Sequence, residues 1–415
     1  MGMVLTLAAM LIAADWEGVR ISVGLEDADI IGDDNRALQA AVDYVAGLGG
    51  GVVEIGEGEF LMEDSLHLRS NVTLIGRGET TILVKSDGFQ SELILDGDYG
   101  EEQITVADPS RFEVGIGVTI LDDRSGGFHT TVATIIASDE NTFRINRPLQ
   151  ADYLVSANAK AQNTFPIISG YYVENVEIRG ISIDGNRQNN PPITGCRGAG
   201  IFLYRARNVH ISHCYVHDYN GDGISFQQSD DIVVENCEVT DNSGYGFHPG
   251  SGSQRPILRG NKSYRNSIGI FVCWRVKNGI FERNELCDNS KMGVSIGHKD
   301  TDNVFRDNLI ARNGIYGIYF RNETEPMGAH RNLIEKNEIL NNGSTDKGYG
   351  IYIDGETHDI TVTGNTIEGS PYGVFVGPKA KGVIIRQNLF KSISVEPIHR
   401  ESERSNVESS DNRIE

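Results

Sequence analysis

The chain has 415 residues, of which 39% are hydrophobic and 48 are glycine, and its formal net charge is −21. This composition permits a large buried core and excludes wholesale disorder, while the glycine content indicates a backbone that turns often. The negative charge argues against nucleic acid as a partner, and an anionic polysaccharide would need a locally basic cleft. Five cysteines without a CxxC pair signal neither a disulfide framework nor a zinc site, so no metal ligands are assigned.

Residues 1–32 form an N-terminal segment whose apolar run, Val4 to Ala14, is too short to span a bilayer, so no membrane partner is expected. The run has the length of a signal-peptide core and ends in small residues, but no positive region precedes it. The alternative is an apolar segment that covers the open end of the fold. A signal peptide implies export to the periplasm or the outside, and a cap leaves a cytoplasmic location open. The sequence does not set the oligomeric state.

One amphipathic helix is expected near the start of the main unit, residues 33–415. Asp33, Asp34 and Asn35 are typical of a helix N-cap, and the glycine run 47–51 ends the segment. Its apolar stripe consists of Leu38, Ala41, Val42 and Val45. Strand-like runs follow directly, so we expect this helix to cap the first coil of a solenoid.

Residues 98–165 break the pattern of the rest of the chain. They contain the runs ITVAD, GVTILDD, TVATIIA and NTFRINRPL, which alternate over short lengths and are separated by turn residues. We interpret this stretch as a small β-rich insertion, after which the coils resume at Asn175.

A repeat of about two dozen residues dominates the second half of the chain. Eight glycines each begin a short apolar run: Gly200, Gly223, Gly246, Gly269, Gly293, Gly317, Gly350 and Gly373. Successive glycines lie 23, 23, 23, 24, 24, 33 and 23 residues apart. The first and third residues after each glycine are apolar or proline, which predicts short strands with one face inward.

A series of asparagines runs parallel to the glycines. Its members are Asn236, Asn261, Asn284, Asn308, Asn337, Asn365 and Asn388. Asparagine accepts the left-handed backbone conformation and can hydrogen-bond to the asparagine one coil above. Because no helix-length periodicity interrupts this region, the sequence predicts an all-β fold. It is a right-handed parallel β-helix whose coils stack at ~4.8 Å, with an N-terminal capping helix and a small β-rich insertion.

The segments DDNRALQAAVDYVAGLGGGVVEIGEGEF, NVTLIGRG and VEIRGISIDGN resemble the pectate-lyase-like superfamily over nearly the whole chain. The resemblance implies the β-helix fold. It does not imply one reaction, since that superfamily includes polysaccharide lyases, uronan epimerases, related glycosidases and non-catalytic proteins.

Outward positions of the glycine-led strands line up from coil to coil at ~5 Å, a spacing suited to an extended sugar chain. The positive charges there contrast with the acidic chain, and the aromatic residues can stack on sugar faces. The residues expected to bind a polysaccharide or oligosaccharide substrate are Tyr204, Arg205, Asp222, Gln227, Ser251, Trp274, His298, Lys299 and Asn322.

The run Tyr245-Gly-Phe-His-Pro-Gly-Ser251 carries the main catalytic hypothesis. It resembles the Tyr-Gly-Phe-Asp-Pro-His motif of mannuronan epimerases, with His248 in place of the aspartate and Gly250 in place of the histidine. That resemblance implies abstraction of the proton alpha to a uronate carboxylate, which needs a base and a cation. His248 or Tyr245 is the expected base, and Arg275 or Arg321 is expected to neutralise the carboxylate. His248 is predicted to point outward and to bury little surface.

The leading hypothesis is therefore a polysaccharide lyase or epimerase acting on a uronate-containing glycan. A glycoside hydrolase is the alternative enzyme, because Asn220-Gly-Asp222-Gly223 resembles a polygalacturonase motif. The positions where that family carries its second aspartate and its histidine hold Tyr245 and Ile268 here, so the expected carboxylate pair is missing. A non-catalytic carbohydrate-binding solenoid is the third alternative. Calcium is a candidate cofactor through acidic turns such as Asp230–Asp231 or Asp300–Asp302, without a fixed-spacing motif.

Overall fold

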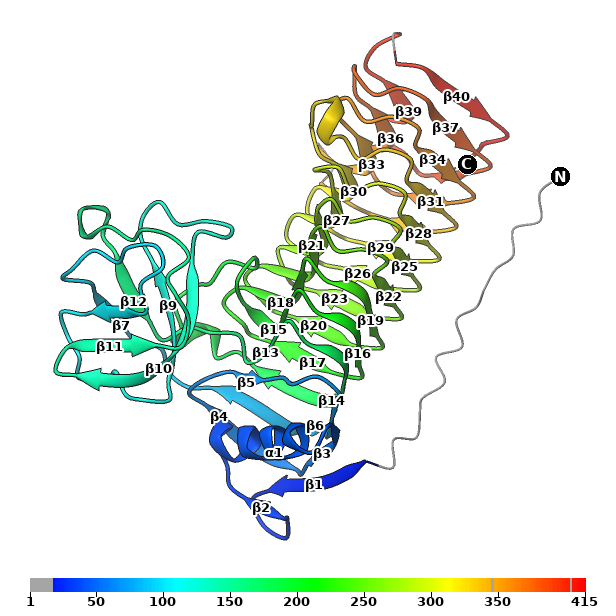
Figure 1. Ribbon diagram of the computed structural model, residues 1–415. Coiled ribbons are helices and arrows are strands. Elements are labelled where there is room, and N and C mark those ends of the chain that lie inside the picture. Colours follow the sequence, from blue (N-terminus) through cyan, green and yellow to red (C-terminus); the bar gives the residue numbers. More distant parts are fainter. Residues whose placement is uncertain (1–17, 345–346, 404) are drawn as a thin grey trace.

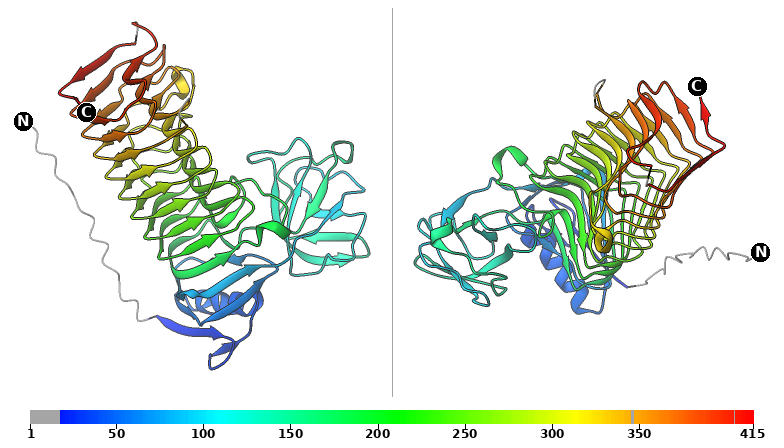
Figure 2. Two further views of the ribbon diagram at one scale, coloured as in Figure 1. Left: turned by 180° about the vertical axis from the view of Figure 1, so that it is seen from behind. Right: turned by 90° about the horizontal axis from the view of Figure 1, so that it is seen from above.

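A computed structural model of the protein describes residues 18–344, 347–403 and 405–415. The chain winds into a long solenoid of stacked coils, and a separate β-rich unit stands out from its side near the N-terminal end (Figure 1). Two further views show the same relation between the solenoid and this unit (Figure 2). The predicted fold, a right-handed parallel β-helix with a capping helix and an insertion, is confirmed.

The glycine-led runs form one parallel sheet of eleven strands along the length of the solenoid. The predicted inward residues, among them Ile201, Ile224 and Phe247, are fully buried and stand opposite one another in adjacent strands. The sheet consists of β5 (Leu66–His67), β13 (Ile168–Tyr171), β15 (Ala199–Tyr204), β18 (Asp222–Gln227), β21 (Tyr245–Ser251), β24 (Ile268–Trp274), β27 (Met292–Ile296), β30 (Tyr316–Phe320), β33 (Tyr349–Ile353), β36 (Tyr372–Val376) and β39 (Glu396–Arg400).

The remaining strands of the coils belong to a second parallel system of 24 strands. The first coils are built from β1 (Val19–Gly24), β2 (Ile30–Ile31), β3 (Gly51–Ile55), β4 (Gly58–Met62), β6 (Val72–Lys85) and β14 (Glu174–Asp184). One column then contains β16 (Arg207–Ser212), β19 (Asp230–Glu235), β22 (Ile257–Arg259), β25 (Ile280–Glu282), β28 (Val304–Arg306), β31 (Leu333–Glu335), β34 (Thr361–Thr363), β37 (Val383–Arg386) and β40 (Val407–Ser410). The next column contains β17 (Tyr215–His217), β20 (Glu238–Thr240), β23 (Lys262–Tyr264), β26 (Glu285–Cys287), β29 (Leu309–Ala311), β32 (Glu338–Leu340), β35 (Thr366–Glu368), β38 (Leu389–Lys391) and β41 (Arg413–Ile414).

Stacked asparagines mark the turn between these two columns. From Asn261 to Asn412, each amide Nδ2 donates to the Oδ1 of the asparagine one coil on, at 2.8–3.0 Å. The prediction was wrong at Asn236, because the backbone N–H that donates to Asn261 belongs to Cys237. Asn236 itself is left-handed, at φ 53°, but from Asn261 onward the left-handed residue is not the asparagine. It is the residue before it, such as Arg283, at φ 54°.

The predicted helix, α1 (Asn35–Gly47), covers the first coil. Asp34 caps it by accepting hydrogen bonds from the backbone N–H groups of Arg36 and Ala37. Its buried face contains the predicted stripe of Leu38, Ala41, Val42 and Val45. The helix thus closes the end of the hydrophobic core, which would otherwise be open to water.

The insertion is a six-stranded antiparallel sheet with its own hydrophobic core. It lies between β6 and β13 in sequence, and an isolated bridge between Leu93 and Val106 joins its two edges. Its strands are β7 (Gln90–Glu92), β8 (Gln103–Thr105), β9 (Gly117–Leu121), β10 (Thr131–Asp139), β11 (Thr142–Ile145) and β12 (Lys160–Gln162).

The expectation for residues 1–14, a signal peptide or an apolar cover, lies outside the described residues. Within the described ranges, no helix has both the length and the apolar character needed to cross a membrane.

Candidate active site

A cleft of about 620 Å³ lies where the eleven-stranded sheet faces the insertion. One wall is a loop of the insertion, Gly127 and Phe128, and another is the segment 192–196 that precedes β15. The floor comes from β18, β21 and β24, from the turns before them and from the turn before β27. The residues on this floor are Asn220, Gly221, Asp222, Ser243, Gly244, Tyr245, His248, Ser251, Ser267, Phe271, Cys273, Trp274 and Lys291.

A carboxylate and an imidazole form a buried pair at the floor of the cleft. Nδ1 of His248 lies 2.7 Å from Oδ2 of Asp222, and the two side chains are only 5% and 4% exposed. The other carboxylate oxygen, Oδ1, accepts the backbone N–H of Tyr245 at 2.8 Å. Both oxygens of Asp222 are therefore engaged. This geometry makes Asp222 the partner of His248, and direct binding of substrate by Asp222 stays a prediction.

The pair fixes how His248 can act. Since a carboxylate accepts a hydrogen bond, Asp222 holds the proton of the neutral imidazole on Nδ1 and leaves a lone pair on Nε2. Among the described residues, no hydrogen-bond partner occupies Nε2. A base oriented in this way by a second group is a common arrangement for proton abstraction.

A glycine in the covering segment makes room for this pair. A Cβ at Gly195 would lie 1.6 Å from Oδ2 of Asp222 and 2.9 Å from Nδ1 of His248. The same segment also contacts β18, where Ser225 donates a hydrogen bond to the carbonyl oxygen of Gly195 at 2.6 Å. His248 does occupy an outward position of β21, but this segment and the neighbouring aromatic rings bury it. The expectation that it buries little surface was wrong.

Tyr245 lies beside His248 and is held by the next coil. Its ring stacks on Phe271 with 4.1 Å between centroids, and its edge contact with His248 spans 5.4 Å. Burial, reinforced by the charge of Asp222, raises the pKa of Tyr245 to about 12. The phenol is therefore protonated at neutral pH. This protonation state suits a proton donor rather than the base that the sequence left open.

The two arginines predicted to neutralise a carboxylate are not among the residues that line the cleft. Arg321 is largely buried and donates to Ser295 Oγ and to the carbonyl oxygen of Val272, both at 2.9 Å, and it pairs with Asp300. Arg275 is exposed, lies 5.3 Å from the Trp274 ring, and is not among the cleft residues. Neither arginine lines the cleft beside His248, although Arg321 lies 4.6 Å from the ring of Phe271 on the cleft floor. Their role in neutralising a substrate carboxylate stays a prediction.

The cleft contains a different cation, which the sequence analysis missed. Lys291 is exposed at the cleft floor, and its ammonium group has no hydrogen bond or ion pair with the described residues. The strand register places it one coil beyond Ser267 and two beyond Gly244. The signal was available in the sequence: the position two residues before each repeat glycine forms its own column along the sheet.

The predicted substrate-binding residues do not all lie in the cleft. Ser251 and Trp274 line the cleft, and Lys299 and Asn322 are exposed outside it. Gln227 is fully buried and donates to Ser225 Oγ at 3.0 Å. It therefore cannot touch substrate, and that prediction was wrong.

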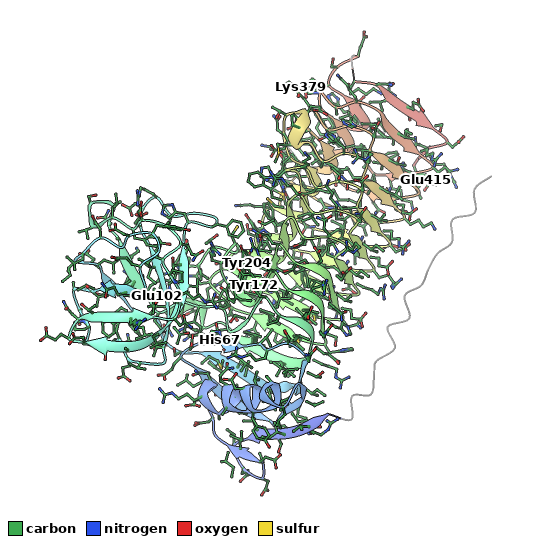
Figure 3. All side chains as sticks on the ribbon, in the orientation of Figure 1. His67, Glu102, Tyr172, Tyr204, Lys379 and Glu415 are labelled. Carbon is green, nitrogen blue, oxygen red and sulfur yellow. The ribbon has the colours of Figure 1, made fainter. Side chains whose placement is uncertain are left out.

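Tyr204 belongs to a second cavity of about 390 Å³ between the solenoid and the insertion. Figure 3 shows Tyr172 and Tyr204 where these two parts meet. Arg147 lies 3.6 Å from the Tyr171 ring centroid, and Arg197 packs against Phe128, a wall residue of the first cleft, at 4.9 Å. This second cavity is therefore cationic and aromatic and adjoins the first. Arg205 lies beside it, with Nε donating to Gln228 Oε1 at 2.9 Å.

The acidic turns considered for calcium are largely engaged by arginine. Asp231 pairs with Arg255, and Asp302 pairs with Arg331, each at 2.7 Å. Burial raises the pKa of Asp300 to about 7, and the carboxyl group faces Arg321. Calcium at these turns would have to displace these partners.

The comparison with known families settles the family of the chain. The model described as a right handed beta helix region matches residues 156–325, 199–367 and 277–414, which together cover more than half of the chain. The chain belongs to the right-handed β-helix family. As a β-helix protein it carries its cleft on the outer face of one sheet, beside the insertion.

This β-helix protein is similar to curated mannuronan C5-epimerases of Azotobacter vinelandii. It is 22% identical to AlgE5 over 339 residues, covering 79% of this chain and 23% of AlgE5. It is 24% identical to AlgE4 over 268 residues, covering 65% of this chain and 34% of AlgE4. The chain thus spans about a quarter to a third of the length of these relatives.

Solved structures show the same fold. The A-module of A. vinelandii mannuronan C-5 epimerase AlgE6 matches with a TM-score of 0.62 at 16% identity, covering 95% of this chain and 99% of that chain. A hyperthermoactive exopolygalacturonase from Thermotoga maritima matches with a TM-score of 0.53 at 15% identity, covering 94% and 91%. At these identities the likeness establishes the fold alone, and the reaction has to be argued from the cleft.

Proposed function

We propose that this β-helix protein is a carbohydrate-active enzyme that abstracts the proton alpha to the carboxylate of a uronate in a glycan, with epimerisation or β-elimination as the outcome. The observation that carries the proposal is the Asp222–His248 pair, which presents a base with a free Nε2 at the floor of a glycan-sized cleft. The activity named for the similar A. vinelandii proteins, mannuronan C5-epimerase, supports the same reaction class.

Three groups divide the work of the proposed reaction. Nε2 of His248 takes the proton, and Asp222 stabilises the imidazolium that forms. The ammonium of Lys291 offsets the charge that develops on the uronate carboxylate. Tyr245, held protonated by its high pKa, returns a proton to the carbanion in an epimerase or to the departing oxygen in a lyase.

Glycoside hydrolysis fits the cleft less well. That reaction uses two carboxylic residues that flank the scissile bond. Asp222 is the one acidic residue among the described residues that line the cleft, and both of its oxygens are already hydrogen-bonded. A binding module without turnover is disfavoured for a different reason, since binding alone does not require a buried, carboxylate-oriented imidazole.

The test is incubation of the protein with a panel of uronans in D₂O, followed by NMR and product mass spectrometry. The panel contains polymannuronate, polyguluronate, polygalacturonate and a glucuronan. An epimerase should place deuterium at the carbon alpha to the carboxylate, with inversion of that centre. A lyase should leave no hydrogen isotope on that carbon and should give an ultraviolet-absorbing unsaturated end instead. New reducing ends with neither deuterium nor ultraviolet absorbance would favour the hydrolase, and glycan binding with no chemical change would favour the binding module.

A further inference from the structure

A second polar relay lies beside the Asp222–His248 pair and plays no part in the proposed uronate chemistry. Sγ of Cys273 lies 3.0 Å from Nδ1 of His298, and Nε2 of His298 lies 2.7 Å from Oε1 of Glu323. The thiol lines the same cleft as His248. A nucleophile, a base and a carboxylate paired with the base thus lie in sequence.

The stacking of the solenoid builds this relay. The three residues are spaced 25 apart in the sequence, so each comes from the coil after the previous one. Cys273 is on β24, His298 follows β27, and Glu323 follows β30. The His298 ring packs against the Trp274 ring with 5.5 Å between centroids, and the His298 side chain is 34% exposed. The imidazole is therefore held in place while remaining open to solvent and to a ligand.

The charges around His298 favour one tautomer. The Glu323 carboxylate, 2.7 Å from Nε2, favours a proton on that nitrogen, so the lone pair of the neutral ring is on Nδ1, facing the thiol. Nη2 of Arg321, 3.4 Å from Nδ1, also disfavours a proton there. Burial and the charge of Arg321 lower the pKa of His298, against the opposing charge of Glu323. His298 is thus a neutral base near pH 7.

The thiol is suited to activation by that base. Burial raises the pKa of Cys273 to about 12, opposed by Arg321 and increased by Asp300, so the resting group is a thiol and not a thiolate. A protonated nucleophile of this kind acts when an adjacent base removes its proton during attack, as hydroxyl nucleophiles do. The product of attack by sulfur on an acyl carbon is a thioester, which water can cleave without a metal or an oxidant.

We propose that Cys273, His298 and Glu323 remove ester-linked acyl groups from hydroxyls of the glycan that occupies the cleft. The glycan as substrate rests on the proposed function above. In the first step Nδ1 of His298 takes the thiol proton while sulfur attacks the ester carbonyl carbon. The sugar oxygen leaves with that proton, and the acyl group stays on sulfur. In the second step His298 takes a proton from water, the resulting hydroxide attacks the thioester, the proton returns to sulfur, and a carboxylic acid is released.

The experiment uses two probes, 4-nitrophenyl acetate and chemically O-acetylated polymannuronate, in buffer with a reductant. We expect acetate release and, in acid-quenched samples, an acetyl group on Cys273 by peptide mass spectrometry. Cys273→Ala and His298→Asn should lower acetate release about a hundredfold, and Glu323→Gln about tenfold. Cys196→Ala is the matched control, because Cys196 lines the same cleft but its thiol has no imidazole partner among the described residues.

Equal acetate release by Cys273→Ala and by the unchanged protein would overturn the inference, as would an acetyl group found only on Cys196. The thermal midpoint of each variant shows whether it is folded, and Glu323→Gln leaves both the thiol and the imidazole in place. The aryl ester reports on the relay without any glycan. Its cleavage therefore separates failure of this inference from failure of the uronate proposal, which is measured on uronans by deuterium incorporation and by ultraviolet absorbance.

Discussion

Oδ2 of Asp222 and Nδ1 of His248 are 2.7 Å apart although 26 residues separate them in the sequence. The relation arises because Asp222 begins β18 and His248 is in the middle of β21, the next strand of the same sheet. Gly195 covers both side chains. A pair that is both buried and hydrogen-bonded links the stability of the coil to the chemistry of the cleft, and the first two predictions follow from that link.

Replacing His248 by alanine should affect activity and stability together. We expect turnover to fall about a hundredfold or more, the usual scale for a lost acid–base group. We also expect the free energy of unfolding to fall by about 1–3 kcal/mol, because the Asp222 carboxylate would remain buried without its partner. His248→Asn is the matched control: its amide N–H can still donate to Asp222, so it should retain stability and lose activity. Denaturant titration and turnover assays measure the two effects, and an active His248→Asn would contradict the assignment of the base.

Asp222→Asn should leave the His248 imidazole in place but prevent it from acting as a base. The backbone N–H of Tyr245 donates to Oδ1, so the amide oxygen of an asparagine must stay there and its NH₂ group must face His248. Nδ1 would then have to accept, which moves the imidazole proton to Nε2 and removes the lone pair. We expect kcat to fall by about 10²–10⁴-fold with little change in KM. Since Asp222 acts through His248, a changed KM with an unchanged kcat would disprove this role.

Lys291→Met should weaken both binding and turnover of a uronan, because the cleft loses its unpaired ammonium group. We expect kcat/KM to fall about tenfold or more and to depend less on salt concentration than in the unchanged protein. Arg275→Met is the comparison, since Arg275 is an exposed cation outside the cleft. The measurement is kcat/KM of both variants at two ionic strengths. A larger loss of kcat/KM in Arg275→Met than in Lys291→Met would favour Arg275 as the residue that neutralises the uronate carboxylate.

Tyr245→Phe removes one hydroxyl group and keeps the ring that stacks on Phe271. We expect a loss of about a hundredfold in turnover with an unchanged thermal midpoint. Because burial raises the pKa of Tyr245 to about 12, its proton is present through the neutral and moderately alkaline range. The pH profile of the unchanged protein should therefore show no tyrosine-linked decline until close to that value. A decline that begins near neutral pH and disappears in Tyr245→Phe would contradict this assignment.

The fold itself should show a pH dependence that originates at Lys85, at the junction of the solenoid with the insertion. Its ammonium donates to Asn163 Oδ1 at 3.0 Å and lies 4.4 Å from the Phe165 ring. Burial lowers the pKa of Lys85 to about 7, whereas the unfolded chain keeps the ordinary value near 10.4. Between these values the unfolded state binds more protons, so stability rises with pH.

That rise has an upper limit of about 1.4 kcal/mol per pH unit from this single group. Lys85→Met should remove it, so the difference in unfolding free energy between the two proteins should change steadily from about pH 7 to pH 10. Denaturant titrations at four pH values in this window measure the difference. Parallel pH curves for the two proteins would show that Lys85 titrates in the fold as it does in the unfolded chain.

The sequence by itself determined the architecture. The spacing of the repeat glycines and the period-two alternation after them predicted which side chains face inward, and Ile201, Ile224 and Phe247 are buried as expected. The helix cap at Asp34 and the apolar stripe of α1 were also predicted from the sequence, since both depend only on local geometry within one element. Local patterns of this kind are sufficient for a solenoid because each coil contacts mainly its neighbours.

Only the tertiary structure decided the cleft. The alternation places His248 and Gln227 outward, but it cannot show that the segment before β15 covers His248 or that Gln227 is fully buried. The coil spacing of the sequence predicted Arg275 and Arg321 as cations near His248. In the structure Arg321 pairs with Asp300, and Lys291 is the one cation among the described residues that line the cleft. The direction of a long side chain depends on the partners that surround it in space, and those partners come from coils and loops far apart in the sequence.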